Sequence, residues 1–160
     1  MTKTFEKRSG FTLIELLLVI GVIVALAVTV FVALNPAGRL SQARDARRVS
    51  DVDALLTATH QYILDNSGSL PTGISTSSDS MIGTCSTAAT TTTGGCNVLN
   101  GSSCFNAGSN YAAYLKTIPN DPLTSTATTT NYAITSVATS GIVTVKACGV
   151  EKLSQAWSSR

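Results

Sequence analysis

The most constraining feature of the sequence is an apolar run from Phe11 to Leu34. Of its 24 residues, 20 are hydrophobic and one, Glu15, is charged. At about 1.5 Å rise per residue a helix of this length extends about 36 Å, whereas the hydrocarbon core of a bilayer is about 30 Å thick. The run therefore predicts a single membrane-spanning helix. A basic stretch that contains Lys3, Lys7 and Arg8 precedes it.

Glu15 distinguishes between interpretations of this helix. A carboxylate inside a membrane costs a few kcal/mol and is normally kept for a purpose, with a partner nearby. No Lys, Arg or His lies between Phe11 and Leu34, so the span itself holds no partner. A cut after Gly10 would give Phe11 a free α-ammonium one helical turn from Glu15, or beside the Glu15 of a neighbouring subunit. Glu15 therefore favours a processed anchor over an uncleaved one.

A cleaved secretory signal is a third interpretation. Residues 25–27, Ala-Leu-Ala, are similar to a small-residue cleavage site, which would start the mature chain at Val28. Two observations argue against it: the apolar core of such a signal would contain Glu15, and apolar residues continue beyond the site to Leu34. We therefore expect processing at the basic end of the run.

The residues around this point form a motif with fixed offsets. A short basic leader ends in Gly and is followed by Phe-Thr-Leu-Ile-Glu and the apolar run, over residues 7–15. The motif resembles the class III signal of type IV pilins and type II secretion pseudopilins. The resemblance implies cleavage between Gly10 and Phe11 by a membrane-embedded prepilin peptidase, followed by N-methylation of Phe11. It also implies that Glu15 pairs with that terminus on an adjacent subunit and so sets the axial register of a helical filament.

The resemblance implies a location and further partners as well. The precursor would lie in the cytoplasmic membrane as a single-pass protein with its N-terminus inside, in contact with lipid. An inner-membrane assembly platform would then transfer it into a periplasmic or extracellular filament of copies of itself and other pilins. Basic residues flank the span on both sides, so the charge bias alone is indecisive, and the motif provides the orientation.

Four segments follow from this reasoning: a leader at 1–10, a transmembrane and assembly helix at 11–34, an amphipathic continuation at 35–65 and a head at 66–160. Pro36 removes one helical hydrogen bond and disfavours helix at Asn35, which predicts a helix break there. Beyond it, apolar or small residues recur at steps of three and four as far as Asp65: Val49, Val52, Leu56, Thr59 and Ile63. Pilins resemble this pattern, with the amphipathic half packed on a small sheet, and their helix often melts around such a proline.

The arginines of the amphipathic segment allow two interpretations. Arg44, Arg47 and Arg48 form either a solvated helix face with local ion pairs, such as Arg47 with Asp51, or a surface for lipid phosphates and acidic residues of adjacent subunits. We favour the solvated face.

The head is expected to complete an α+β, pilin-like fold in which the long kinked helix packs on a small antiparallel β-sheet. Residues 132–138 and 142–150 are rich in β-branched side chains and flank Thr139-Ser140-Gly141, which predicts a hairpin. Ser109 is expected to cap a short helix that ends at Pro119, with four apolar or aromatic residues on one face: Tyr111, Tyr114, Leu115 and Ile118.

Two loops of the head bear on modification and metal binding. The Thr/Ser-rich segment that contains residues 90–95 predicts an exposed loop, whose hydroxyls would accept O-linked sugars as in some pilins. Residues 114–122 and 131–134 are similar to the stretch that enters the sheet in major pseudopilins, some of which bind calcium in the intervening loop. Residues 123–130 contain no Asp or Glu, so we expect no metal, and Asp121 is predicted to be a turn residue.

All four cysteines, Cys85, Cys96, Cys104 and Cys148, lie in the head. An even number in an oxidising compartment indicates two disulfides, with free buried thiols as the alternative. Three connectivities are possible. We favour Cys85–Cys96 with Cys104–Cys148, because the second bridge would tie the region before the short helix to the last strand.

Other functional classes find little support in the sequence. The single histidine, His60, lies on the amphipathic segment, and the sequence contains no nucleophile-elbow, paired-carboxylate or phosphate-loop pattern, so neither an enzyme nor a cofactor is expected. A net charge of +2 and 6% aromatic residues do not indicate a nucleic-acid partner. The expected function is that of a structural subunit of a type IV pilus-like filament. The alternatives are a type II secretion pseudopilin and a single-pass or secreted extracytoplasmic binding protein.

Overall fold

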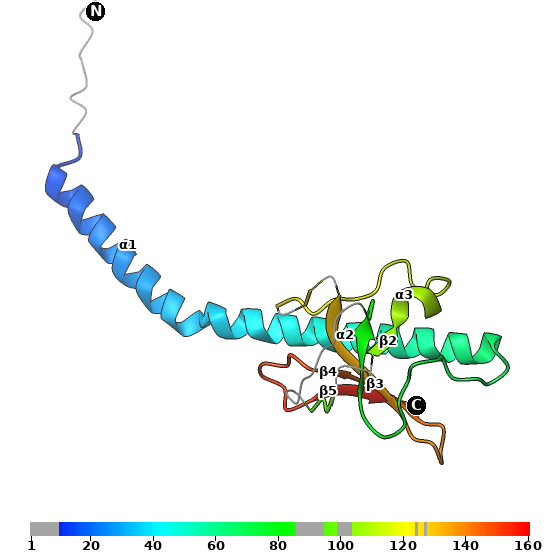
Figure 1. Cartoon of the computed structure of the whole chain (residues 1–160). Helices are drawn as coiled ribbons and strands as arrows, with labels where there is room; N and C mark the ends of the chain where they lie inside the picture. The colour runs from blue at the N-terminus through cyan, green and yellow to red at the C-terminus, as the bar shows by residue number, and fades with distance from the viewer. Residues whose placement is uncertain (1–9, 86–94, 99–103, 124, 127) are drawn as a thin grey trace, which may run out of the picture. The chain divides into compact units, whose positions relative to one another are not determined.

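The structure, a computed structural model, describes residues 10–85, 95–98, 104–123, 125–126 and 128–160 (Figure 1). The chain divides into two compact units, Met1–Arg39 and Leu40–Arg160.

The N-terminal unit is built on helix α1, Leu13–Leu34. It is long and apolar enough to cross a membrane, and none of its 22 residues is buried. Asn35 ends α1 in the left-handed region, with φ 41° and ψ 68°, and Pro36 is the first residue of helix α2. Proline suits a first helical position because it has no N–H to donate, so one helix ends and the next begins at this point.

The second unit, Leu40–Arg160, contains most of helix α2, Pro36–Asp65, besides residues 66–160, and from here on this whole unit is called the head. Helix α2 ends at the position that the sequence predicts. The head also contains a five-stranded sheet of order β2-β1-β3-β4-β5. Its strands are β1 Ser80–Gly83, β2 Cys104–Asn106, β3 Thr129–Ser136, β4 Val143–Ala147 and β5 Ala156–Ser159. The chain therefore has an α+β fold, with a long N-terminal helical segment and a small sheet.

The sheet is mixed rather than antiparallel as expected. Strands β1 and β2 pair in parallel, with Met81 opposite Cys104, whereas the other neighbours pair antiparallel. A parallel pair needs a crossover connection, and residues 84–103 provide a connection of sufficient length. The predicted hairpin is confirmed: it is β3–β4, with Tyr132 opposite Ala147 and Ser136 opposite Val143.

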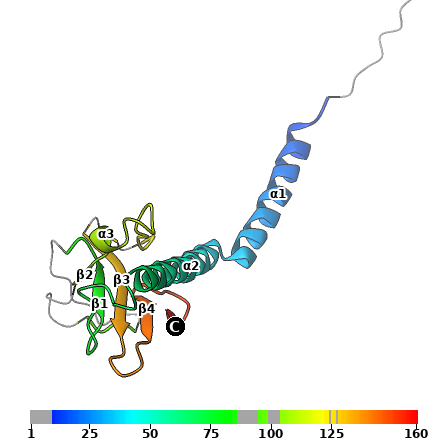
Figure 2. The ribbon, with the colours of Figure 1, turned by 90° about the vertical axis from the view of Figure 1, so that its right-hand side faces the viewer.

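Helix α2 packs on one face of the sheet (Figures 1 and 2). The core between them contains buried residues of α2, β3 and β4: Val52, Leu55, Leu56, Ala58, Tyr132, Ile134, Val143, Val145 and Ala147. The buried face of α2 differs slightly from the apolar stripe that the sequence predicts. Leu55 and Ala58 are buried although the stripe did not include them, whereas Val49, which it did include, is 43% exposed.

A second, smaller core covers part of the opposite sheet face. It contains Met81, Cys96, Val98, Ala133 and Cys148. Because successive side chains of a strand point to opposite faces, the neighbours Ile82, Ile134 and Ala147 lie in the helix-covered core instead. We call this second side the outer face of the sheet.

The short helix of the head differs from its prediction. Helix α3 is Ala107–Asn110, and its cap is Asn106, whose side chain accepts a hydrogen bond from the Ser109 N–H. Asparagine caps a helix as well as serine does, and it comes first in the chain. Tyr111 lies beyond α3, fully buried, with its hydroxyl bonded to Thr59 of α2. The four apolar and aromatic residues expected on one helix face instead belong to the core or pack against it from the turn and irregular chain that follow α3.

The disulfide pairing that we favoured from the sequence is wrong. The bridges are Cys85–Cys104 and Cys96–Cys148. Parallel pairing of β1 with β2 brings Cys104 beside Met81, and Cys85, with φ 59°, turns the chain back towards it. Cys96 instead lies on the outer face with Cys148, because the backbone of Asn97 is bonded to Asp79 just before β1.

Candidate functional site

The start of α1 is held by a reciprocal cap. The Thr12 side chain accepts a hydrogen bond from the Glu15 backbone N–H, while Glu15 Oε2 accepts from the Thr12 N–H at 2.9 Å and from its hydroxyl at 2.8 Å. Such a capping box satisfies N–H groups that the first turn of a helix would leave without a partner. Glu15 is therefore bonded locally although the span contains no cation.

The other carboxylate oxygen of Glu15 is free to accept a further hydrogen bond. Within the described part of the chain Oε1 has no partner, and Glu15 makes no salt bridge there. The neutral capping bonds from Thr12 do not neutralise the carboxylate charge. The geometry therefore leaves Glu15 able to pair with a cation, which the α1 segment does not itself supply.

Gly10 and Phe11 precede the helix in an accessible stretch. Both are exposed, Phe11 by 86%, and among the described residues other than its chain neighbours no atom lies within 4 Å of the position that a Cβ on Gly10 would occupy. The packing of the described residues thus places no demand for glycine at position 10. The peptide bond between Gly10 and Phe11 can be reached by another protein.

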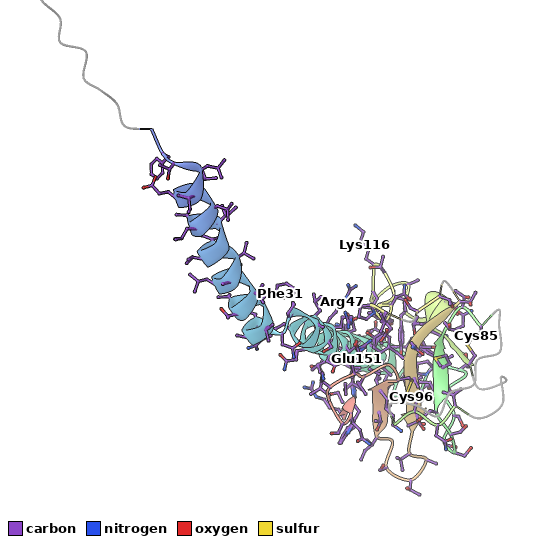
Figure 3. The ribbon with its side chains drawn as sticks, turned by 90° about the vertical axis from the view of Figure 1, so that its left-hand side faces the viewer. Phe31, Arg47, Cys85, Cys96, Lys116 and Glu151 are labelled. Carbon is purple, nitrogen blue, oxygen red and sulfur yellow. A yellow bond between two sulfur atoms is a disulfide. The ribbon has the colours of Figure 1, made fainter. Side chains whose placement is uncertain are left out.

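The surface of α1 is apolar around its whole circumference. Its large hydrophobic side chains are exposed by 49% at Val19 to 80% at Leu13, and they radiate from all sides of the helix (Figure 3). A helix that is hydrophobic all round is normally buried, in lipid or among other helices. The apolar surface of α1 therefore has to be buried in lipid or among other helices, and the N-terminal unit itself supplies neither.

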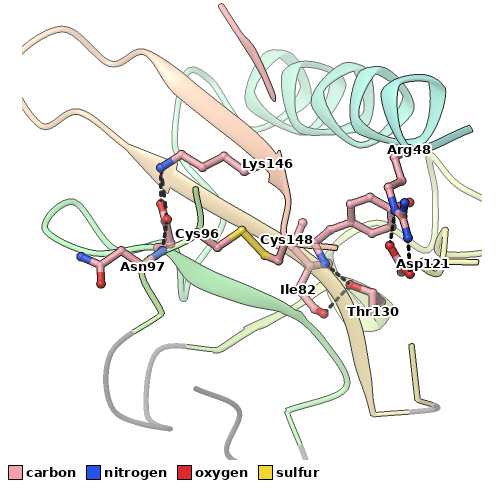
Figure 4. Close-up of a disulfide and its surroundings, with 10 residues drawn as sticks. Arg48, Ile82, Cys96, Asn97, Asp121, Thr130, Lys146 and Cys148 are labelled. Carbon is pink, nitrogen blue, oxygen red and sulfur yellow. Dashed lines mark hydrogen bonds and ion pairs between the residues drawn. A yellow bond between two sulfur atoms is a disulfide. The ribbon is translucent and has the colours of Figure 1, made fainter. Parts of the chain in front are cut away.

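The structure also reveals a charged cluster that the sequence did not indicate. Arg48 is fully buried, and its guanidinium donates to Asp121 at 2.6 and 3.1 Å (Figure 4). It also donates to Asp45 at 2.7 Å. The two-pronged contact with Asp121 is the geometry in which arginine and carboxylate bind most strongly. Arg48 makes a local ion pair with Asp45, as the first sequence interpretation expects, but the residue is buried rather than solvated, and it is not free for lipid or another subunit.

Asp45 connects α2 to the segment after β4. Its carboxylate accepts backbone N–H bonds from Glu151 at 3.1 Å, Lys152 at 2.7 Å and Leu153 at 3.0 Å. Burial raises the pKa of Asp45, but these backbone bonds and Arg48 outweigh burial and lower the pKa to about 2. The carboxylate is thus charged in the folded head at neutral pH.

The two arginines that precede Arg48 on the helix, Arg44 and Arg47, differ in their ion-pair partners and in their exposure. Arg44 donates to both carboxylate oxygens of Glu151, at 2.7 and 2.6 Å, and this bond is the main cause that lowers the pKa of Glu151 to about 2. The Arg47 side chain is 63% exposed and lies 3.7 Å from Asp51, as the solvated-face interpretation predicts. Only Arg47 keeps the environment that the sequence suggested.

Asp121 has the turn role that we predicted and a second role that we did not. Its Oδ1 accepts from the Leu123 N–H at 2.9 Å, which closes a turn. The same carboxylate is the principal partner of Arg48. The one sequence signal for this pairing was the isolated acid in a charge-poor region, and the partner 73 positions away was not identifiable from it.

The remaining sequence predictions fall partly outside the described residues. Positions 90–94 of the Thr/Ser-rich loop lie there, as do residues 1–9 of the leader. Within the described part of the chain, no group of three His, Cys, Asp or Glu side chains could hold a metal ion.

Comparison of the chain with protein-family models, with curated proteins and with solved structures gives no match.

Proposed function

We propose that this protein is a prepilin-type structural subunit that is cleaved after Gly10, N-methylated at Phe11 and assembled into a type IV pilus-like filament. The observation that carries the proposal is Glu15: a carboxylate near the start of an apolar helix that contains no cation. Cleavage after Gly10 creates a cation at the neighbouring position Phe11. The motif that resembles the class III signal of pilins and pseudopilins places all three residues at the required offsets.

The geometry of the segment supports this chemistry. The bond that would be cut is exposed and outside the helix, and Oε1 of Glu15 is available for an ammonium group. In a filament, apolar helices exchange lipid for one another, and the pair between Glu15 and the neighbouring Phe11 ammonium favours one axial stagger. A buried charge is tolerated when it is paired and hydrogen-bonded, so only the correct stagger is stable.

The head supports an extracytoplasmic location. Its two disulfides are the type of bond that persists in oxidising compartments outside the cytoplasm. The precursor would therefore span the cytoplasmic membrane with its leader inside and its head outside.

A type II secretion pseudopilin shares the N-terminal signal and is the second candidate. The four cysteines, the Thr/Ser-rich segment and the acid-free residues 123–130 favour the pilus-type subunit. An anchored or secreted binding protein of another class would lack the processed terminus, so the state of the mature N-terminus separates it from both.

The deciding experiment is intact mass and N-terminal sequencing of the protein from cells with and without a prepilin peptidase. We expect the mature chain to begin at methylated Phe11 only where the peptidase is present. A start at Met1 or at Val28 in those cells would refute the proposal. Gly10→Phe is the matched variant and should leave uncleaved precursor. Because no described residue beyond the chain neighbours lies within 4 Å of a Cβ at position 10, the head should melt as in the wild type.

A further inference from the structure

The outer face of strands β4 and β5 carries a cavity of about 250 Å³ that the proposed function does not use. Its lining consists of Gly95, Thr144, Lys146, Gln155, Ala156 and Trp157. Thr144 and Lys146 alternate along β4 with Val143, Val145 and Ala147, which are buried under α2. The cavity therefore lies on the sheet face opposite to that helix.

Trp157 forms an aromatic wall of this cavity. It stands opposite Lys146 across β4 and β5 and remains 55% exposed. Its Nε1–H donates to Gln155 Oε1 at 2.8 Å, which holds the indole in one orientation. A fixed, accessible aromatic face suits a ligand with a flat apolar face of its own.

Lys146 adds a charged group without adding net charge. Its Nζ lies 3.1 Å from both oxygens of Asp79, and Asp79 Oδ2 in turn accepts from the Asn97 backbone N–H at 2.6 Å (Figure 4). An ammonium has three N–H donors, so this pair leaves one of them for a ligand. Because the charges of Lys146 and Asp79 neutralise each other, this pair does not make the cavity selective for a charged ligand.

Two further polar groups of the lining have no partner within the described part of the chain. They are the Thr144 hydroxyl, a donor and acceptor, and the Gln155 side-chain NH₂, a donor. Together with Lys146 they provide hydrogen-bonding groups of both kinds beside the indole face.

We propose that this cavity binds a neutral, hydroxyl-rich ring, namely one pyranose residue of a carbohydrate. Sugar hydroxyls donate and accept in the way that Thr144, Gln155 and Lys146 require, while the C–H face of the ring stacks on Trp157. A charged ligand would meet no uncompensated opposite charge, because Lys146 is already paired with Asp79. The volume of about 250 Å³ is slightly below the range of about 300–1,000 Å³ that is typical of ligand sites, which fits one ring rather than a long chain.

The test uses the full chain in a zwitterionic detergent without a sugar headgroup. Trp157 is the only tryptophan of the protein, so its fluorescence reports directly on the cavity. Titration with glucose, galactose, mannose and N-acetylglucosamine should give a saturable change for at least one of them, with a dissociation constant in the millimolar range expected for so small a ligand. Glucuronate and glucosamine should bind more weakly than their neutral parents.

Three variants that keep Trp157 localise the effect. Lys146→Met should weaken binding by about tenfold, and Thr144→Val by about threefold, from the loss of one hydrogen bond each. Lys152→Met is the matched control, since that exposed side chain lies outside the cavity, and it should bind like the wild type. Thr144→Val is the safer variant for the fold, because Lys146→Met leaves the buried Asp79 without its cation.

A separate readout tests the stacking surface. In saturation-transfer NMR, Trp157→Phe should retain sugar contact and Trp157→Ala should lose it. The proposal is overturned if no neutral sugar gives a saturable signal up to about 100 mM, or if Thr144→Val and Lys146→Met bind like the wild type. A stronger response to the charged sugars would equally overturn it. None of these results depends on processing or filament assembly.

Discussion

The two units of the molecule differ in whether their carboxylates have a cation partner within the same unit. In the N-terminal unit α1 carries one carboxylate, Glu15, and no cation, and none of its residues is buried. In the head, Asp45, Asp79 and Asp121 are buried, and each is paired with a cation of the head itself. Buried charges are stable only when paired, so the head satisfies its own requirement.

The difference indicates which unit depends on other molecules. The head has a core, two disulfides and internal ion pairs. Helix α1 instead has an exposed apolar surface that nothing in its own unit buries and a carboxylate, Glu15, without a cation. Substitutions in the head should therefore change its stability, and substitutions at the start of α1 should change assembly.

Glu15→Ala should permit processing yet reduce filament yield by at least about tenfold, because in the proposed filament the Phe11 ammonium of the neighbouring subunit would lose its partner. Filaments are counted by electron microscopy and by shearing, and the thermal midpoint of the head should not change. Thr12→Ala is the matched control: it removes the capping box and keeps the carboxylate. A similar loss of filaments in both variants would mean that Glu15 acts only as a helix cap.

Arg48→Met should destabilise the head by about 3–5 kcal/mol, since it leaves Asp45 and Asp121 without their cation. Chemical denaturation of the full chain in detergent micelles measures this. Arg47→Met, at the exposed neighbour of Arg48, should cost less than about 1 kcal/mol. Equal effects in the two variants would contradict the buried cluster.

Removal of a disulfide should destabilise the head, somewhat more for the bridge that closes the longer loop, because the entropic cost grows with the logarithm of loop length. In the chain-entropy account Cys96→Ala with Cys148→Ala costs about 4 kcal/mol, and Cys85→Ala with Cys104→Ala costs about 3 kcal/mol, for sequence separations of 52 and 19. Helix content of α1 should be unchanged. Peptide mapping of the oxidised protein checks the pairing first, and a Cys85–Cys96 peptide would contradict it.

Acid should weaken the head through Asp45, whose pKa is lowered to about 2 from an ordinary 3.8. The folded state binds that proton less readily than the unfolded state does. The resulting stability is fully present above about pH 4, is lost as the pH falls towards about 2, and amounts to about 2 kcal/mol. Thermal unfolding across this window measures the slope, and Asp45→Asn should reduce it. An equal slope in that variant would assign the acid sensitivity to other carboxylates.

Sequence reasoning succeeded where the relevant residues are close together in the chain. The end of the helical segment at Asp65 follows from local apolar spacing, and the β3–β4 hairpin from β-branched runs around a short turn. It failed at α3, where two residues that favour helix caps, Asn106 and Ser109, lie three positions apart and the structure uses the first.

The candidate processing segment is a sequence property throughout. A span needs about twenty contiguous apolar residues, so Phe11 to Leu34 and the exceptional Glu15 are visible without coordinates. Tertiary structure alone decided the parallel β1–β2 pair, the cysteine pairing, the burial of Arg48 and the cavity beside Trp157. These features join residues that are distant in sequence, such as Arg44 and Glu151 at a separation of 107. Local sequence patterns do not predict such contacts, because the identity of a partner depends on which strands and helices pack together.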